Sequence, residues 1–184
     1  TIPDQFDIPE FANHPEMHKF LAAWHGWRGN DLVPNRKTVR LSDISSVMSH
    51  AMLMDMVSPT QIMCRFMGSI YMDIYGKDFT GRNYLDITQP QFREARSKRL
   101  FCVVNQPCAA VWTTESDMGG GKTATAVGVS VPIIPATKGA PMQLMQTLVF
   151  SVAIPPSEYG KPTRYRHFDI SNRFETIDIG AGSP

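Results

Sequence analysis

The sequence lacks several features that would assign it to a familiar class at once. No apolar run approaches the ~20 residues that a membrane-spanning helix needs. The 18 lysine and arginine residues nearly balance the 17 aspartate and glutamate residues, so no strong field attracts nucleic acid or an acidic membrane. The first residues show neither the basic start nor the apolar core of a signal peptide. We therefore expect a cytoplasmic protein that binds neither nucleic acid nor membrane.

Cysteine is scarce as well. The chain has three cysteines, Cys64, Cys102 and Cys108, and no CxxC pair. An odd count without such a pair fits a reduced, cytosolic chain better than a disulfide framework. Methionine is abundant, with 11 residues, and its flexible side chain suits adaptable cores and pockets. Ordinary core filling is the main alternative for these methionines.

No spacing of residues indicates catalysis. Neither a Ser-His-Asp set, nor a Cys-His pair, nor a pair of carboxylates can be assigned from the sequence. Cys102 and Cys108 are the only candidate nucleophiles, and inert burial is the main alternative for both. We therefore expect a protein that is not an enzyme, and rank a small enzyme last among the functions considered.

Metal and cofactor signatures are also missing. His14, His18 and His25 are spaced by four and seven and can share one helix face, but no acidic or cysteine cluster completes a metal site. The helix expected over 88–105 has no histidine for haem. Cys64-Arg65-Phe66 is similar to part of a flavin-photosensor motif, but Ile62 and Met63 precede it instead of Gly and Asn. We expect surface histidines and leave the identity of any cofactor open.

The run Gly119-Gly120-Gly121-Lys122-Thr123 invites comparison with a phosphate-binding loop. Such a loop needs a glycine where this sequence has Ser116, and it must lead into a helix. Here strand patterns flank the run on both sides. We therefore interpret it as the turn of a β-hairpin.

The 184 residues suffice for one domain with a substantial core. Apolar residues at helical spacing predict an amphipathic helix over 15–28, and Ser42 can cap a short helix. Strands are expected over 51–57, 61–67, 108–116, 123–134 and 142–154, and helices over 69–75, 81–87 and 88–105. Pro132 inside a strand indicates an edge or a bulge.

The strand expected over 142–154 is apolar on both faces. Leu144 and Leu148 lie on one side, with Met145 and Val149 on the other. A strand of this kind lies in the middle of a sheet and is covered twice. The helices of the middle segment should cover one face, and helix 15–28, alone or with a partner chain, the other.

Glycines punctuate the stretch from Cys64 to Arg82. Gly68 follows a strand pattern, Gly76 ends a short helix, and Gly81 marks a second turn. This pattern predicts a strand and short helices wrapped around a small cavity, which favours ligand sensing over catalysis.

These elements together resemble the PAS domain family, and more narrowly its bacterial standalone group. The resemblance rests on Trp24 in the N-terminal helix and on three segments, Leu32-Val33-Pro34-Asn35-Arg36, Arg65-Phe66-Met67-Gly68-Ser69 and Gly76-Lys77-Asp78-Phe79-Thr80-Gly81-Arg82. Ser69 stands where the group usually has Thr and keeps the hydroxyl. The match covers about residues 18–154.

The resemblance implies an α+β PAS fold, with a five-stranded antiparallel sheet, helices on one face and an extra N-terminal amphipathic helix. We expect an N-terminal arm and helical cap over 1–50, the PAS core over 51–154, and a polar surface tail over 155–184. The resemblance also implies signalling by ligand binding or by contact with a separate output protein. A ligand-free interaction or dimerisation module is the alternative.

Two sets of residues follow as candidates. The expected ligand pocket, between the sheet and helix 88–105, is lined by Arg65, Tyr71, Tyr75, Tyr84, Phe92 and Trp112. An internal salt bridge for Arg65 and core packing for the aromatic residues are the alternatives. The expected homodimer interface comprises Phe20, Trp24 and Trp27 of helix 15–28.

Overall fold

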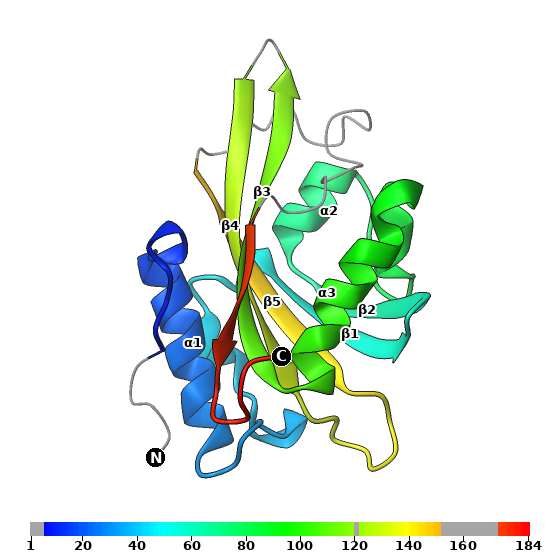
Figure 1. Cartoon of the computed structure of the whole chain (residues 1–184). Helices are drawn as coiled ribbons and strands as arrows, with labels where there is room; N and C mark the ends of the chain where they lie inside the picture. Colours follow the sequence, from blue (N-terminus) through cyan, green and yellow to red (C-terminus); the bar gives the residue numbers. More distant parts are fainter. Residues whose placement is uncertain (1–5, 120–121, 152–172) are drawn as a thin grey trace.

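A six-stranded antiparallel sheet forms the centre of the computed structural model, which describes residues 6–119, 122–151 and 173–184 (Figure 1). The strand order is β2-β1-β5-β4-β3-β6. The strands are β1 (Ala51–Ser58), β2 (Gln61–Met67), β3 (Cys108–Gly119), β4 (Lys122–Ile133), β5 (Gln143–Phe150) and β6 (Arg173–Asp178). An α+β PAS-type architecture is thereby confirmed, with one strand more than expected.

Helices lie on both sides of the sheet (Figure 1). The described ranges contain three α-helices, α1 (Pro15–Arg28), α2 (Ser69–Tyr75) and α3 (Arg93–Asn105). Short 3-10 helices are η1 (Glu10–Ala12), η2 (Arg36–Thr38), η3 (Leu41–Ile44), η4 (Met48–His50), η5 (Tyr84–Ile87) and η6 (Pro90–Phe92). The expected helix 88–105 therefore starts later, because Pro90 opens a separate 3-10 turn, and only 84–87 of the expected helix 81–87 is helical.

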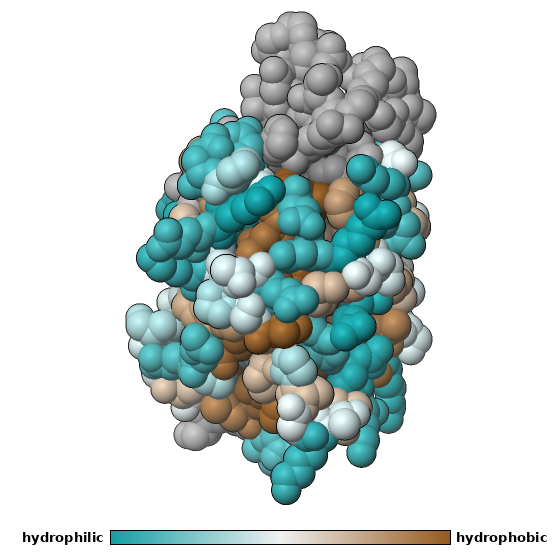
Figure 2. Space-filling view, turned by 90° about the vertical axis from the view of Figure 1, so that its right-hand side faces the viewer, coloured by the Kyte–Doolittle hydropathy of each residue, from teal (hydrophilic) through white to brown (hydrophobic). Residues whose placement is uncertain are grey.

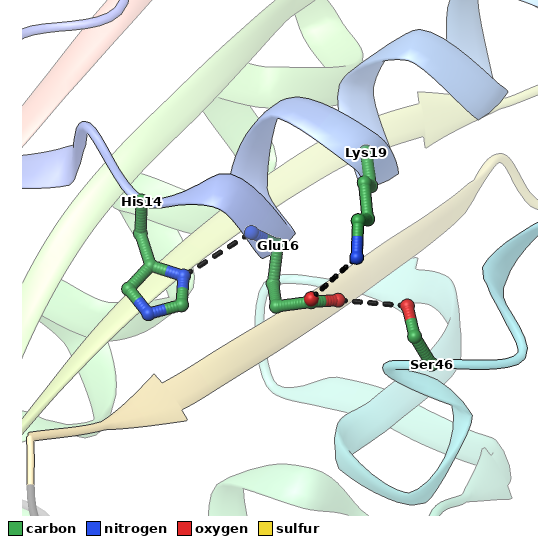
Figure 3. Close-up of polar contacts among 4 residues, drawn as sticks. All are labelled: His14, Glu16, Lys19 and Ser46. Carbon is green, nitrogen blue, oxygen red and sulfur yellow. Dashed lines mark hydrogen bonds and ion pairs between the residues drawn. The ribbon is translucent and has the colours of Figure 1, made fainter.

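The first turn of α1 is held by side-chain contacts (Figure 3). The His14 imidazole caps the helix, its Nδ1 accepting from the backbone N–H of Glu16 at 3.2 Å. The Glu16 carboxylate accepts from Lys19 Nζ at 2.8 Å and from the hydroxyl of Ser46 at 2.7 Å. These contacts join the start of α1 to the segment between η3 and η4.

Two apolar clusters occupy the two faces of the sheet, and β5 contributes to both. Leu144 and Leu148 belong to the cluster under α2 and α3, whereas Met145 belongs to the cluster under α1. The expectation that this strand is covered twice is confirmed. Helix α1 of the same chain provides the second cover, so no partner chain is needed for it.

Burial in this second cluster corrects the expected dimer interface. Phe20 and Trp24 have no exposed surface, and Trp27 is 6% exposed. The indole Nε1 of Trp24 donates to the backbone oxygen of Pro132 at 2.9 Å, and that of Trp27 donates to Asp43 Oδ2 at 2.9 Å. These side chains fill the chain's own core, so a homodimer, which stays a prediction, requires another surface.

Pro132 occupies a position that needs no ladder donor from its nitrogen. It pairs with Leu144 of β5, but the pairing of β4 with β3 ends at Ser130 and Ala110. On its β3 side, β4 is therefore locally an edge at Pro132, which is where a proline is tolerated in a sheet.

The sixth strand corrects the interpretation of residues 155–184 as a surface tail for residues 173–184, and residues 155–172 lie outside the described part. Strand β6 pairs antiparallel with β3, from Cys108 opposite Asp178 to Thr113 opposite Arg173. Ile177 and Ile179 are buried in the cluster under α1. The end of the described chain is therefore part of the sheet and of the core.

None of the helices in the described ranges is both long enough and apolar enough to cross a membrane.

Candidate functional site

A chain of polar side chains crosses the face of the sheet that α2 and α3 cover. Trp112 of β3 donates from Nε1 to the hydroxyl of Ser130 on β4, at 3.0 Å. That hydroxyl in turn contacts Oε1 of Gln146 on β5, at 3.5 Å. Ser130 has no exposed surface and Gln146 is 2% exposed. Three neighbouring strands thus place hydrogen-bonding groups within an otherwise apolar layer.

The amide nitrogen of Gln146 makes only a weak hydrogen bond to a neighbouring strand. Its Nε2 reaches the sulfur of Met52 on β1, at 4.0 Å. A thioether is a weak acceptor, so this contact replaces little of the hydration that the amide loses on burial. The side chain of Gln146 has a further contact, with the Tyr71 hydroxyl.

Tyr71 of α2 approaches the same group from the helical side. Its hydroxyl donates to the backbone oxygen of His50 at 2.9 Å and also interacts with Gln146. Burial, with smaller effects of Tyr84 and Cys64, raises the pKa of Tyr71 well above its ordinary value. The phenol therefore stays protonated and serves as a neutral donor in the layer.

Tyr84, Phe92 and Tyr75 are placed less centrally. Tyr84 begins η5, is half-buried against the cluster under α3, and has the Arg96 guanidinium 5.9 Å from its ring centroid. Phe92 is half-buried at the end of η6. Tyr75 ends α2, and its side chain lies outside the described part.

Arg65 lies on the opposite face of the sheet, which corrects its place in the expected pocket. Its Nε donates to Oδ2 of Asp55 at 2.5 Å, and Gln143 Nε2 donates to the other oxygen of Asp55 at 2.7 Å. Asp55 alternates along β1 with Met54 and Met56, whose side chains face α2 and α3. Arg65 therefore forms the internal salt bridge that was its alternative role.

The structure thus brings together three of the predicted residues, Tyr71, Tyr84 and Trp112, and adds two that sequence reasoning missed. Ser130 and Gln146 are polar residues on apolar strands. The sequence did contain a signal for Gln146. Alternate residues of a strand point to the same face, and Gln146 therefore shares a face with Leu144 and Leu148. A polar residue among such apolar neighbours marks a buried site that needs a partner.

Cys64 of β2 also belongs to this layer, but as an inert thiol. It is fully buried, and desolvation, with a smaller effect of Asp78, raises its pKa to about 12. A thiol of this kind is protonated at neutral pH and is a poor nucleophile.

The histidines occupy separate environments. His14 caps α1, His18 hydrogen-bonds Asn13 Oδ1 at 2.7 Å, and His25 packs edge-on against Phe6. Within the described ranges, no group of three or more His, Cys, Asp or Glu side chains is placed to hold a metal ion. The turn expected at Gly119–Thr123 joins strands that pair up to Gly119 and Lys122, and no helix follows it, in agreement with a hairpin.

Two surface hollows of the described ranges lie away from this polar layer. One of about 720 Å³ lies beside the end of α1, lined by Trp27, Arg28 and Asn35 among others. Another of about 430 Å³ lies along α3. Figure 2 shows a side of the molecule on which polar side chains predominate and apolar ones appear between them. The polar layer itself is buried within the fold.

Comparison with known proteins gave one result. A family model described as PAS domain matches residues 12–145, which include α1 and the strands up to the start of β5. Neither the curated proteins nor the solved structures gave a match.

Proposed function

Because the chain belongs to the PAS domain family, whose members are generally sensory or interaction modules, we propose that it is a cytosolic sensor that binds a small molecule. The ligand binds between the sheet and helices α2 and α3, next to Trp112 and Gln146. The signal leaves through contact with a separate output protein.

The observation that carries the proposal is the buried polar chain through Trp112, Ser130, Gln146 and Tyr71. Burying polar groups costs free energy unless they are hydrogen-bonded, and a core needs none of them for packing. Groups of this kind within an apolar layer are typical of small-molecule sites, where a few of them orient the ligand.

The character of this layer also favours one class of ligand. Trp112, Tyr71 and Tyr84 supply aromatic surface, and the polar groups are a hydroxyl, an amide, a phenol and an indole N–H. The cationic side chain of Arg65 is engaged on the other face. We therefore propose an uncharged ligand with an aromatic ring and at least one hydrogen-bonding group.

A thermal-shift screen of small uncharged aromatic compounds, joined to native mass spectrometry of the freshly purified protein, tests this proposal. We expect a compound that raises the melting temperature of the natural chain in a concentration-dependent way. Gln146→Met, which keeps the length of the side chain without its amide, should abolish that rise. Arg65→Met is the matched control on the opposite face and should preserve it.

Failure of every compound to shift the melting temperature, together with a mass equal to that of the bare chain, would contradict ligand binding. The ligand-free interaction module would then be the better reading. A rise that survives Gln146→Met but is lost in Arg65→Met would place the ligand on the wrong face and contradict the site.

A further inference from the structure

Two of the three cysteines meet where α3 ends and β3 begins. Cys102 lies in the last turn of α3, and Cys108 is the first residue of β3. The Cys108 thiol donates to the backbone oxygen of Cys102, at 3.9 Å. This contact places the Cys108 sulfur beside the residue that carries the second thiol, and a disulfide forms when the two sulfur atoms approach to about 2.05 Å.

The two thiols differ in access. Cys102 is half-buried and lines the hollow of about 430 Å³ along α3, together with Ser97, Lys98 and Phe101. Cys108 and Cys64 are fully buried. A small reagent in solvent therefore reaches Cys102 before Cys108.

The thiols also differ in acidity. The neighbouring Cys108 thiol lowers the pKa of Cys102, against a smaller opposing effect of burial. The same contact, with burial and the charge of Asp178, raises the pKa of Cys108. The Cys102 thiol itself donates to the backbone oxygen of Arg99, at 3.0 Å. Cys102 is thus the better nucleophile of the pair, and Cys108 the proton-bearing partner.

We propose that Cys102 and Cys108 form an oxidation site for hydroperoxides, with Cys102 as the attacking and Cys108 as the resolving thiol. The Cys102 thiolate, after its proton passes to water, attacks the terminal oxygen of the hydroperoxide. The O–O bond breaks, the alcohol leaves with a proton, and Cys102 becomes a sulfenic acid. The Cys108 sulfur then attacks the Cys102 sulfur, and the S–O bond breaks as water leaves with the Cys108 proton. Two thiols and one hydroperoxide give one disulfide, one alcohol and one water.

The position of this disulfide connects it to the fold. It joins α3, which covers the polar layer, to β3, which carries Trp112 and pairs with β6 from Cys108 onward. The bond would tie the end of that helix to the strand beneath it. This inference rests on the cysteines alone and does not depend on the proposed ligand.

The test uses the full natural chain, reduced and then treated with hydrogen peroxide. Remaining thiols are alkylated and the protein is digested with trypsin. Residues 100–122 contain both Cys102 and Cys108, and residues 41–65 contain Cys64, so two tryptic peptides separate the pair from the control. We expect peptide 100–122 to have the mass of its reduced form less two hydrogens, with neither cysteine alkylated. Cys64 should stay alkylated and react at least about tenfold more slowly.

Variants separate the two roles. Cys108→Ala should leave the sulfenic acid on Cys102 without a resolving partner, so that dimedone labels it, whereas the natural chain should give little adduct. Cys64→Ala should form the disulfide at the natural rate. The proposal is overturned if the natural chain keeps both thiols, if Cys64 enters the disulfide, or if Cys102 proceeds to sulfinic acid while Cys108 stays a thiol.

Discussion

Gly128 allows the Trp112 side chain to lie across the sheet. The two residues are directly opposed on β4 and β3. A Cβ atom at Gly128 would lie 2.2 Å from Cζ2 of the Trp112 ring, far inside contact distance. The missing side chain therefore provides the space from which the indole reaches Ser130.

We predict that Gly128→Ala displaces the Trp112 ring and breaks its hydrogen bond to Ser130. The expected loss is about 1–3 kcal/mol in the free energy of unfolding, the usual cost of overpacking a core. Urea denaturation measures it. Gly26→Ala is the matched control, because a Cβ there meets no atom within 4 Å and alanine favours the helix. Equal stability of the two variants would show that the ring does not depend on Gly128.

His50 should give the stability of the fold a dependence on pH. Burial lowers the pKa of His50 in the folded chain below its ordinary value of about 6.5. The unfolded chain therefore takes up this proton at a higher pH than the folded chain does. As the pH falls below about 6.5, the free energy of unfolding decreases, until the folded chain also becomes protonated.

Urea denaturation at several values between about pH 7.5 and pH 5.5 tests this sign. His50→Gln should flatten the slope, because it removes the titrating group while keeping the backbone oxygen that accepts from Tyr71. The carboxyl of Glu16, whose pKa is also shifted, does not interfere with the test. Its pKa is lowered, mainly by the hydrogen bond from Lys19, so its stabilising effect is lost only at pH values below about 4.5. An unchanged slope in His50→Gln would contradict the assignment.

At the scale of elements, the apolar stripe of α1 was visible in the sequence but its partner was not. Helical spacing of Phe20, Trp24 and Trp27 predicts an amphipathic helix whichever surface it meets. The hydrogen bond from Trp24 to Pro132 and the burial of Phe20 show that the partner is the sheet of the same chain.

Phe20→Ala distinguishes a core role from an interface role. We predict a loss of about 3–5 kcal/mol in the free energy of unfolding, typical of truncating a buried phenylalanine. Lys19→Ala, next to it on the exposed side, removes only a surface ion pair and should cost under about 1 kcal/mol. Light scattering and urea denaturation are measured on both variants. If the Phe20→Ala chain kept the stability of the natural chain but light scattering gave a smaller particle mass, Phe20 would belong to a dimer interface after all.

The elements that sequence reasoning located well have strong periodic signals, and the others do not. Helix α1 and strand β2 agree with their predicted bounds because apolar spacing and flanking turns are clear. Strand β6 was missed because it is only six residues long and has a single apolar side chain on each face, among polar and charged neighbours. Its pairing with β3 depends on a long-range contact that local patterns do not contain.

The face on which Arg65 lies was unpredictable for a related reason. The pairing of β1 with β2 shifts between Leu53 and Met54, where Leu53 opposes Phe66 but Met54 opposes Cys64. This irregularity leaves Arg65 without an opposite residue in the ladder. A bulge interrupts the alternation of side chains between the two faces of a strand. Counting residues along β2 therefore does not predict the face on which the Arg65 side chain lies.

At the scale of the whole molecule, the polar layer depends on an arrangement that no single segment encodes. β1 pairs with β5, so Met52 lies opposite Gln146, 94 residues further along the chain. The sequence could indicate that Trp112 and Tyr71 face a common layer, because their strand and helix were found correctly. It could not indicate that Ser130 and Gln146 meet, because their contact depends on the pairing of β4 with β5.

The same arrangement makes the described part of the expected arm and helical cap, residues 6–50, part of the core. Under α1 and the neighbouring 3-10 helices, the sheet presents the side chains of Leu53, Val111, Val129, Val131 and Met145. Burying one such side chain contributes about 1.5–3 kcal/mol. Exposing all five would remove an amount comparable to the whole stability of a domain, about 5–15 kcal/mol.

We therefore predict that a chain shortened to residues 51–184 does not fold into a stable monomer, even though it retains every strand of the sheet. Size-exclusion chromatography should show aggregation, and any soluble fraction should bind a hydrophobic dye and lack a cooperative thermal transition. Adding residues 1–50 as a separate peptide provides the control, because it can restore the missing cover by mass action. A shortened chain that is monomeric and melts at the temperature of the natural chain would mean that the strands alone define the domain, and that α1 is an accessory to it.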